Sequence, residues 1–137
     1  MNTRIVVIGG PRTGKTTYAK DFPWPTRCSD PKSLGGDADD RLDLPSKERW
    51  SAISAEVASW LDAVGPWVIE GVAVPRALRK WREAHPLMPC PVDEIHLLMT
   101  PRVALTPGQA AMGKGVQTVL NEIMPWLLAT AKIVRIA

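Results

Sequence analysis

The segment GGPRTGKTT, from Gly9 to Thr17, carries residue types at a spacing that binds phosphate. It matches the Walker A pattern G-x-x-x-x-G-K-[ST] without a gap. Glycines let the backbone wrap closely with several N–H groups pointing inward, and the start of a helix adds the positive end of its dipole. The preceding apolar run Arg4–Ile8 predicts a buried parallel strand. Strand, loop and following helix are the context that this pattern requires, so we predict a phosphate-binding loop (P-loop).

The side chains of this loop have distinct expected roles. We expect Lys15 to reach the β- and γ-phosphates of a nucleotide, and the hydroxyl of Thr16 to ligate Mg²⁺. Thr17 either touches an α-phosphate oxygen or caps the turn, and Arg12 either contacts phosphate or is a solvated loop charge. The expected nucleotide-binding residues are Gly9, Gly10, Pro11, Arg12, Thr13, Gly14, Lys15, Thr16 and Thr17.

Two carboxylates follow predicted strands, at the sheet edge where parallel α/β proteins bind ligands. Glu70 ends the apolar run WVI, and we expect it to hold Mg²⁺, through water, or to orient an attacking water. The alternative is a glutamate that starts a surface turn. Asp30 follows the segment TRCS and is expected to accept a proton from a substrate hydroxyl or to bind the water shell of the metal. The alternative is an Asx turn before Pro31.

Basic residues also lie near the predicted strand ends. Arg76, Arg79 and Lys80 are spaced i, i+3, i+4 on one predicted helix, and form either a clamp for a phosphorylated second substrate or a solvated face. Arg76 is nearest the strand end and is the preferred ligand. Arg102 or Lys114 is expected to bring a positive charge over the γ-phosphate when a loop closes. The candidate catalytic residues are Lys15, Asp30, Glu70 and Arg76, and the candidate metal ligands are Thr16 and Glu70.

The elements that must position these residues alternate between strand and helix along the whole chain. This alternation predicts an α/β fold of three layers, α/β/α, with a parallel sheet, helices on both faces and right-handed crossovers. The predicted strands are Arg4–Ile8, Thr26–Ser29, Trp67–Ile69, Glu94–Met99 and Lys132–Ile136. The predicted helices run from Lys15 to Lys20 or Asp21, from the N-cap Ser46 to Gly65, over Pro75–Ala84, and from the N-cap Thr106 onward.

The last helix contains residues that disfavour a helix. Thr106 and Gln109 form an expected capping box at its start. Gly113 and Gly115 are expected to break or hinge it, with the helix resuming from about Val116 to Leu128. Pro125 is expected to kink it or to end it early.

A chain of 137 residues with 45% hydrophobic residues predicts one domain with a substantial core. Its net charge of +3 fits small phosphorylated ligands and does not by itself argue for nucleic acid. No run approaches the roughly 18 apolar residues of a membrane span, and the N-terminus lacks the layout of a signal peptide. We therefore expect a cytoplasmic protein, with Cys28 and Cys90 as reduced thiols and with no membrane partner.

Two aromatic side chains have competing interpretations. His96 lies between Ile95 and Leu97 in a predicted strand and is expected to be a packed core histidine rather than a ligand. Trp24 either stacks on a nucleobase or packs against the fold, and packing is favoured.

The segments GGPRTGKT, TRCSD and WVIEGVAVPR resemble the small P-loop kinases of the P-loop NTPase superfamily, such as nucleoside monophosphate kinases and shikimate kinases. The resemblance implies a five-stranded sheet in the order 2-3-1-4-5, Mg²⁺ and ATP as phosphoryl donor, and a mobile lid. It also implies that Asp30 contacts the acceptor and that Arg76, after Glu70-Gly71, binds acceptor phosphate. Residues 1–137 would form a single P-loop nucleotide-binding domain, with a short acceptor-side insertion near 30–65 and a lid-like segment near 101–120.

The chain departs from this family in two ways. The lids of such kinases usually carry two or more arginines, whereas the segment from Arg102 to Leu120 offers only Arg102 and Lys114. Arg76 also lies a few residues further after Glu70-Gly71 than the corresponding arginine lies in adenylate kinases.

Three functions stay open from the sequence. The first, which the strand-end residues favour, is a kinase that transfers the γ-phosphoryl group of Mg-ATP to a small-molecule or nucleotide acceptor. The second is an ATPase or nucleotide-dependent switch that acts on nucleic acid or a protein partner. The third is a nucleotide-binding module without turnover. Specificity for GTP is not expected, because the chain has no NKxD-like segment.

Overall fold

Five short parallel strands form the centre of the chain in a computed structural model, which describes residues 3–29 and 47–136. Their order in the sheet is β2-β3-β1-β4-β5, which confirms the predicted topology. The strands are β1 (Arg4–Ile8), β2 (Thr26–Cys28), β3 (Trp67–Glu70), β4 (Glu94–Leu97) and β5 (Lys132–Arg135).

The register of the strands brings the candidate functional residues to one edge. Val7 of β1 pairs with Glu70 of β3 on one side and with His96 of β4 on the other, and Cys28 of β2 pairs with Glu70. The strands are rich in β-branched residues, and all four residues of β3 are buried, as is typical of central strands in a parallel sheet. The carboxyl ends of β1, β2 and β3 therefore meet where the P-loop begins.

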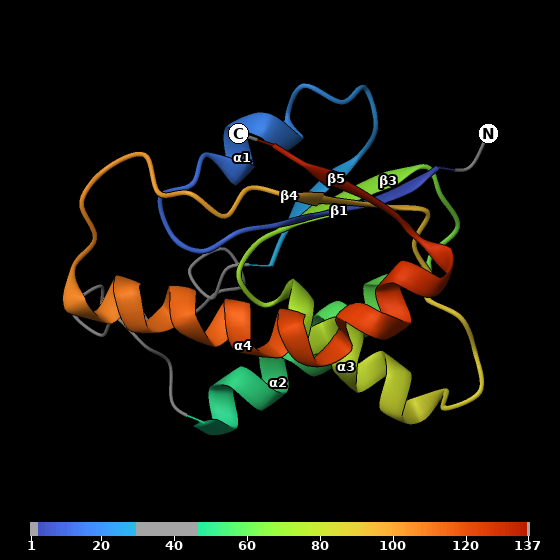
Figure 1. The fold of residues 1–137 in the computed structure, drawn as a ribbon. Coiled ribbons are helices and arrows are strands. Elements are labelled where there is room, and N and C mark those ends of the chain that lie inside the picture. The colour runs from blue at the N-terminus through green and yellow to red at the C-terminus, as the bar shows by residue number, and fades with distance from the viewer. Residues whose placement is uncertain (1–2, 30–46, 137) are drawn as a thin grey trace.

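The helices cover the two faces of the sheet unequally (Figure 1). Three helices pack on one face, namely α2 (Lys47–Trp60), α3 (Val74–Ala84) and α4 (Pro107–Thr130). Among the described helices, only α1 (Lys15–Ala19) covers the other face. The smaller core on that side consists of Ile5, Val7, Ala19, Val68 and Leu98.

Helix α4 is continuous through Gly113, Gly115 and Pro125, so the expected break at the glycines and the expected early end at the proline were wrong. Each glycine costs about 1 kcal/mol in helix propensity and the proline more, but burial of an apolar stripe offsets this cost. That stripe consists of Val116, Val119, Leu120, Ile123 and Leu127. The capping box of Thr106 and Gln109 is confirmed, with both of its hydrogen bonds present.

Helix α2 ends at Trp60, five residues before the expected end at Gly65. The backbone then tightens, because the N–H groups of Leu61, Asp62 and Ala63 each bond to the carbonyl three residues earlier. Val64, which follows this tightened turn, is 82% exposed. The predicted N-cap Ser46 lies outside the described residues, as do residues 30–46 of the expected acceptor-side insertion.

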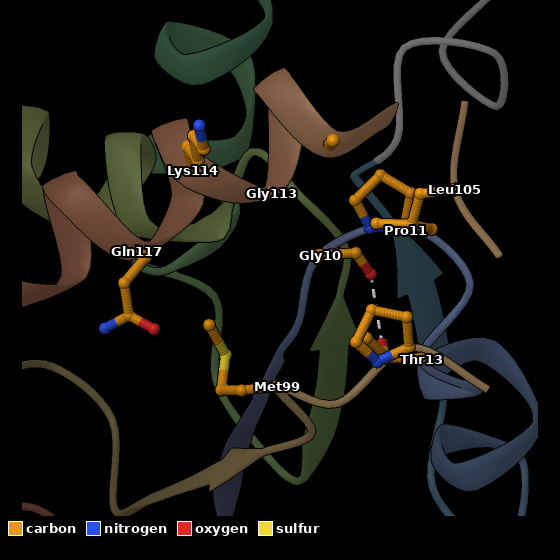
Figure 2. A pocket seen from close by; sticks show the side chains of 10 residues that line it. Gly10, Pro11, Thr13, Met99, Leu105, Gly113, Lys114 and Gln117 are labelled. Carbon is orange, nitrogen blue, oxygen red and sulfur yellow. Dashed lines mark hydrogen bonds between the residues drawn. The ribbon is translucent and has the colours of Figure 1, made fainter. Parts of the chain in front are cut away.

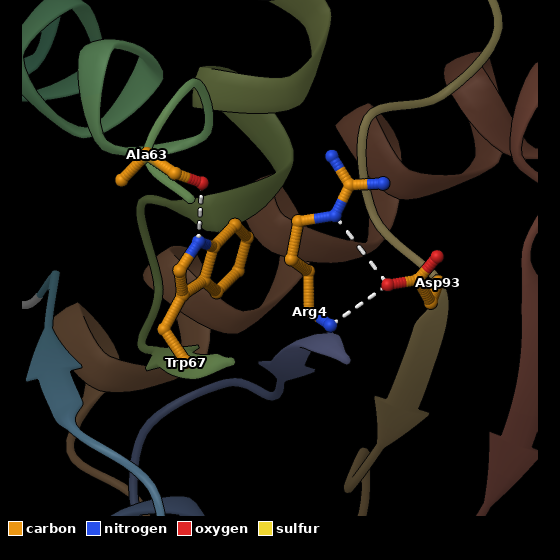
Figure 3. Close-up of polar contacts among 4 residues, drawn as sticks. All are labelled: Arg4, Ala63, Trp67 and Asp93. Carbon is orange, nitrogen blue, oxygen red and sulfur yellow. Dashed lines mark hydrogen bonds and ion pairs between the residues drawn. The ribbon is translucent and has the colours of Figure 1, made fainter. Parts of the chain in front are cut away.

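Polar contacts fasten the amino-terminal ends of the strands, opposite the P-loop (Figure 3). The backbone N–H and the Nε of Arg4 both donate to the carboxylate of Asp93, at 2.8 and 3.4 Å. The indole of Trp67 donates to the carbonyl of Ala63 at 2.9 Å. These contacts tie β1 to the start of β4, and β3 to the turn after α2, at the end of the sheet away from the candidate site.

Within the described residues, no helix combines the length and apolar character needed to cross a membrane. Neither Cys28 nor Cys90 forms a disulfide.

Candidate functional site

The P-loop connects β1 to α1 and wraps around the carbonyl of Gly10. The hydroxyl of Thr13 donates to this oxygen at 3.0 Å, and the Nζ of Lys15 lies 3.4 Å from it. Lys15 is buried at the start of α1, whereas the side chains of Thr16 and Thr17 are exposed. The lysine ammonium is thus held inside the loop, and the threonine hydroxyls are open to a ligand.

Two residues of the loop have positive φ angles, Arg12 at 63° and Gly14 at 85°. Glycine adopts this conformation without cost, whereas a residue with a Cβ is strained there by about 1–2 kcal/mol. Arg12 is therefore a strained residue in the loop. Its carbonyl accepts a hydrogen bond from the backbone N–H of Arg102 at 2.8 Å, which helps to hold this conformation.

Arg102 packs on the P-loop. Its Nε donates to the carbonyl of Thr13 at 3.3 Å, and a Cβ added to Gly14 would lie 2.8 Å from the same nitrogen. Glycine at this position therefore serves both the backbone conformation and the approach of the arginine. The role of Arg102 over a γ-phosphate stays a prediction, but the structure places its side chain against Thr13 and Gly14, the two residues before Lys15.

Glu70 is fully buried at the carboxyl end of β3, so the alternative of a glutamate in a surface turn was wrong. The thiol of Cys28 donates to its Oε1 at 3.4 Å, and the N–H of Ser29 donates to its carbonyl at 2.7 Å. The contact between Cys28 and Glu70 was not predicted. Its signal lies in the register of β2 and β3, which a sequence without pairing information does not contain.

Asp30 lies outside the described residues, so its predicted role stays a prediction. The residue before it, Ser29, is fully buried, and its hydroxyl makes no hydrogen bond to any described residue. The end of β2 therefore places polar side chains beside Glu70.

Arg76 lies in the first turn of α3, between α2 and α4. Its guanidinium sits over the ring of Trp50 at 4.4 Å, and a Cβ added to Gly115 would lie 2.8 Å from its Nη2. Its Nη1 is buried and makes no hydrogen bond within the described part of the chain. Burial, and then the charge of Arg79, lower the pKa of Arg76. A buried guanidinium N–H that lacks a protein partner is suited to bind an oxyanion.

The other two basic residues of this helix are engaged in protein contacts. Arg79 forms an ion pair with Glu122 of α4 at 2.9 Å, and Lys80 donates to the carbonyl of Ser51 in α2 at 2.9 Å. These contacts fasten α3 to its neighbours. The expected three-residue clamp therefore reduces to Arg76 among the described residues.

A cavity of about 260 Å³ lies between the P-loop and α4 (Figure 2). Lys114 and Gln117 of α4 line it, together with Met99 and Leu105 from the segment between β4 and α4. Lys114, predicted as a lid residue, thus shares a cavity with the P-loop residues Gly10, Pro11 and Thr13.

Comparison with solved structures identifies shikimate kinases as similar folds. A shikimate kinase from Bacteroides thetaiotaomicron aligns with a TM-score of 0.51 at 11% identity, over 97% of this chain and 85% of its own. A shikimate kinase from Acinetobacter baumannii in complex with shikimate aligns at 12% identity and a TM-score of 0.47, over 98% and 83%. The chain has the fold of the small P-loop kinases. No protein-family model and no curated protein matches its sequence.

A metal ion in this P-loop kinase fold would depend on few protein ligands. Among the described residues, no group of three or more His, Cys, Asp or Glu side chains could hold an ion. The hydroxyl of Thr16 and the carboxylate of Glu70 are hard oxygen donors, which suit Mg²⁺. Because Mg²⁺ usually keeps waters and binds substrate phosphates, these two donors fit such an ion.

On the α1 face of the P-loop kinase fold, His96 is a buried, hydrogen-bonded residue, as expected. Its Nδ1 lies 2.5 Å from the hydroxyl of Tyr18, and its Nε2 lies 3.0 Å from the Oε1 of Glu94. Burial, and then the charges of Glu94 and Asp21, raise the pKa of Tyr18. This chain of contacts anchors α1, which follows the P-loop, to β4.

Trp24 stacks on Phe22 with ring centroids 6.0 Å apart, and both rings pack against the smaller core. Packing, the favoured interpretation of Trp24, is confirmed.

Proposed function

We propose that the chain is a phosphotransferase that moves the γ-phosphoryl group of Mg-ATP to a small-molecule acceptor. The observation that carries this proposal is the position of Lys15 inside the P-loop, with the buried carboxylate of Glu70 at the end of the adjacent strand. The likeness to small P-loop kinases supports it at the level of the fold.

The P-loop would bind the triphosphate through its backbone N–H groups and Lys15. The Nζ of Lys15 would exchange the carbonyl of Gly10 for a phosphate oxygen, and would then stabilise the negative charge that spreads over the transferred group. Thr16 and Glu70 would hold Mg²⁺, directly or through water, and the ion would supply further neutralisation of the phosphate charge.

The second substrate would lie beyond the γ-phosphate. Arg76 would bind an oxyanion of this substrate through its Nη1, since no described residue uses that group. Asp30 would accept the proton of the acceptor hydroxyl as its oxygen bonds to phosphorus and ADP leaves.

The proposal is tested by incubating the protein with γ-labelled ATP, Mg²⁺ and a panel of acceptors. The panel contains nucleoside monophosphates, small alcohols and shikimate, the last because the aligned structures are named shikimate kinases. We expect a labelled product from at least one acceptor. Hydrolysis of ATP without any labelled acceptor across the panel would instead favour the ATPase.

Two variants with matched controls separate binding from transfer. Lys15→Ala should abolish ATP binding, whereas Lys20→Ala, which removes an exposed lysine at the end of α1, should not. Glu70→Gln should keep ATP binding and lower transfer by about 100-fold or more, whereas Glu56→Gln on the exposed face of α2 should not. Unchanged ATP affinity in Lys15→Ala would overturn the proposal.

A further inference from the structure

Cys28 contacts the candidate metal ligand Glu70 but has no role in the proposed phosphoryl transfer. We propose that Cys28 is a positioning residue, whose thiol holds the carboxylate of Glu70 in the orientation that binds the Mg²⁺ of Mg-ATP. This inference rests on the proposed function and deepens it, because it names the residue that controls the metal ligand.

The register of the sheet places Cys28 and Glu70 on the same face. Cys28 of β2 pairs with Glu70 of β3, and residues paired in a parallel sheet point to the same side. Val7 of β1 also pairs with Glu70 and belongs to the smaller core, which includes a residue of α1. Both side chains therefore point to the face on which α1 begins, with Lys15 and Thr16 in its first turn.

The backbone around this pair is held by contacts of its own. The N–H of Ser29 donates to the carbonyl of Glu70 at 2.7 Å, which ties the end of β2 to the end of β3. The guanidinium of Arg27, next to Cys28, lies 3.8 Å from the ring centroid of Trp60 and fastens β2 to α2. With the backbone held, the direction of the carboxylate depends on the side-chain torsion angles of Glu70.

The thiol restricts these torsion angles. The Sγ of Cys28 donates to the Oε1 of Glu70 at 3.4 Å, and the glutamate side chain is fully buried. An ionised carboxylate offers about four acceptor positions on its two oxygens, so one that accepts from a thiol keeps positions for a metal ion or its water shell. A thiol is a weak donor, and it therefore orients the carboxylate while withdrawing little of the charge that attracts the ion.

Cys28 acts on the ion through Glu70 and not as a ligand itself. Mg²⁺ prefers hard oxygen donors, whereas sulfur ligands suit softer metals. Partners that orient a ligating carboxylate are common in metal sites, and their replacement lowers metal affinity or activity by about 10- to 100-fold. Because the thiol is a weak donor, we expect the effect of Cys28 at the lower end of this range.

The test measures the gain in ATP affinity that Mg²⁺ provides. Isothermal titration calorimetry gives the dissociation constant of ATP in EDTA and in excess Mg²⁺, and the ratio of the two constants is the gain. Cys28→Ala should lower the gain about tenfold and change the constant in EDTA by less than about twofold. Cys28→Ser, which keeps a donor, should retain the gain to within about threefold. The control Thr26→Ala, on the same strand but paired with Val68, should change neither constant by more than about twofold.

A double-mutant cycle with Glu70→Gln shows whether Cys28 acts through the carboxylate. Glu70→Gln should still bind ATP but lose most of the gain from Mg²⁺. In this background, Cys28→Ala should lower the gain no further, because there is no carboxylate left to orient. Equal losses in the two backgrounds would show that Cys28 acts by another route and would overturn the inference.

The infrared S–H stretching band of Cys28 tests the hydrogen bond in the absence of nucleotide. The band is assigned as the one that Cys28→Ser removes. A hydrogen bond to an ionised acceptor is stronger than one to a neutral acceptor, and a stronger bond lowers the S–H frequency. The band should therefore move to higher frequency in Glu70→Gln, and an unchanged frequency would overturn the inference.

The calorimetric titrations distinguish the two proposals. If the wild type gains ATP affinity from Mg²⁺ and Cys28→Ala gains as much, the positioning inference fails and the proposed function stands. If ATP binds without any gain from Mg²⁺, the assignment of Glu70 to the ion fails together with the positioning inference, and the assay for labelled product still decides the proposed function. If the wild type does not bind ATP, both proposals fail.

Discussion

Gly115 and Gly113 differ by two positions on α4 but face different neighbours, and this difference yields a quantitative prediction. A Cβ at Gly115 would lie 2.8 Å from the Nη2 of Arg76, closer than real Cβ contacts allow. A Cβ at Gly113 would find its nearest neighbour, the Cδ of Pro11, at an ordinary 3.9 Å. Alanine at Gly115 should therefore displace Arg76, and alanine at Gly113 should displace nothing.

The expected magnitudes follow from helix propensity and from the contacts of Arg76. Alanine is more favourable than glycine in a helix interior by about 1 kcal/mol. In Gly113→Ala this gain should appear as an increase of the free energy of unfolding. In Gly115→Ala it should be cancelled, because the displaced guanidinium loses its contact with Trp50, worth about 0.5–1 kcal/mol. The gain of Gly115→Ala should return in an Arg76→Ala background, where there is no guanidinium to displace.

Urea denaturation of the wild type, of these three single variants and of the double variant Arg76→Ala/Gly115→Ala measures the coupling. We expect a coupling of about 0.5–1 kcal/mol between Arg76 and Gly115. The same cycle between Arg76 and Gly113, closed with the double variant Arg76→Ala/Gly113→Ala, should give no coupling beyond about 0.3 kcal/mol. If Gly115→Ala stabilises the wild type as much as it stabilises Arg76→Ala, the inferred contact between Arg76 and α4 is wrong.

Three further substitutions test other features of the structure. Arg12→Gly should raise the free energy of unfolding by about 0.5–1 kcal/mol, because relief of the positive φ exceeds the entropic cost of glycine; a decrease on urea denaturation would show that the loop is not strained. Pro125→Ala should raise the free energy of unfolding by about 1–3 kcal/mol, because proline is unfavourable inside a helix and Pro125 of α4 is exposed, so that little packing is lost. An unchanged midpoint of urea denaturation would contradict this. Burial raises the pKa of Cys90 to about 11, which means that the folded state favours the neutral thiol. The contribution of this preference to the free energy of unfolding is present below pH 9 and is lost between pH 9 and 11. Between pH 8 and 11, the free energy of unfolding of Cys90→Ala should therefore fall by about 2 kcal/mol less than that of the wild type. Equal decreases in the two proteins would show that the pKa of Cys90 is not raised.

The topology was predictable because strand and helix signals alternate without ambiguity. Short β-branched runs such as Arg4–Ile8 are separated from one another by helical patterns along the chain. The order of the strands came from the resemblance to P-loop kinases and is confirmed. Helix α4 was predicted less well, because local propensity at Gly113, Gly115 and Pro125 was given more weight than the buried stripe that follows.

The P-loop was predictable because its chemistry depends on residues close in sequence. The surroundings of Glu70 and Arg76 were only partly predictable, because they depend on packing between elements far apart in the chain. Cys28 meets Glu70 through the register of β2 and β3, and Trp50 meets Arg76 through the packing of α2 on α3. Arg102 was expected in a lid, but its contacts with Thr13 and Gly14 place it on the P-loop.

The continuity of α4 changes how Lys114 must act. A lid that closes on a hinge at Gly113 and Gly115 would let Lys114 move independently of the core. Instead, the residues that follow in the same helix, from Val116 to Leu127, are anchored in the larger core. The segment of α4 that carries Lys114 is therefore continuous with the part of the helix that packs on the sheet, and we predict that its side chain supplies a charge at the cavity without a separate closing step. Gly115 of the same helix lies against the guanidinium of Arg76, so α4 contacts both the cavity and that guanidinium.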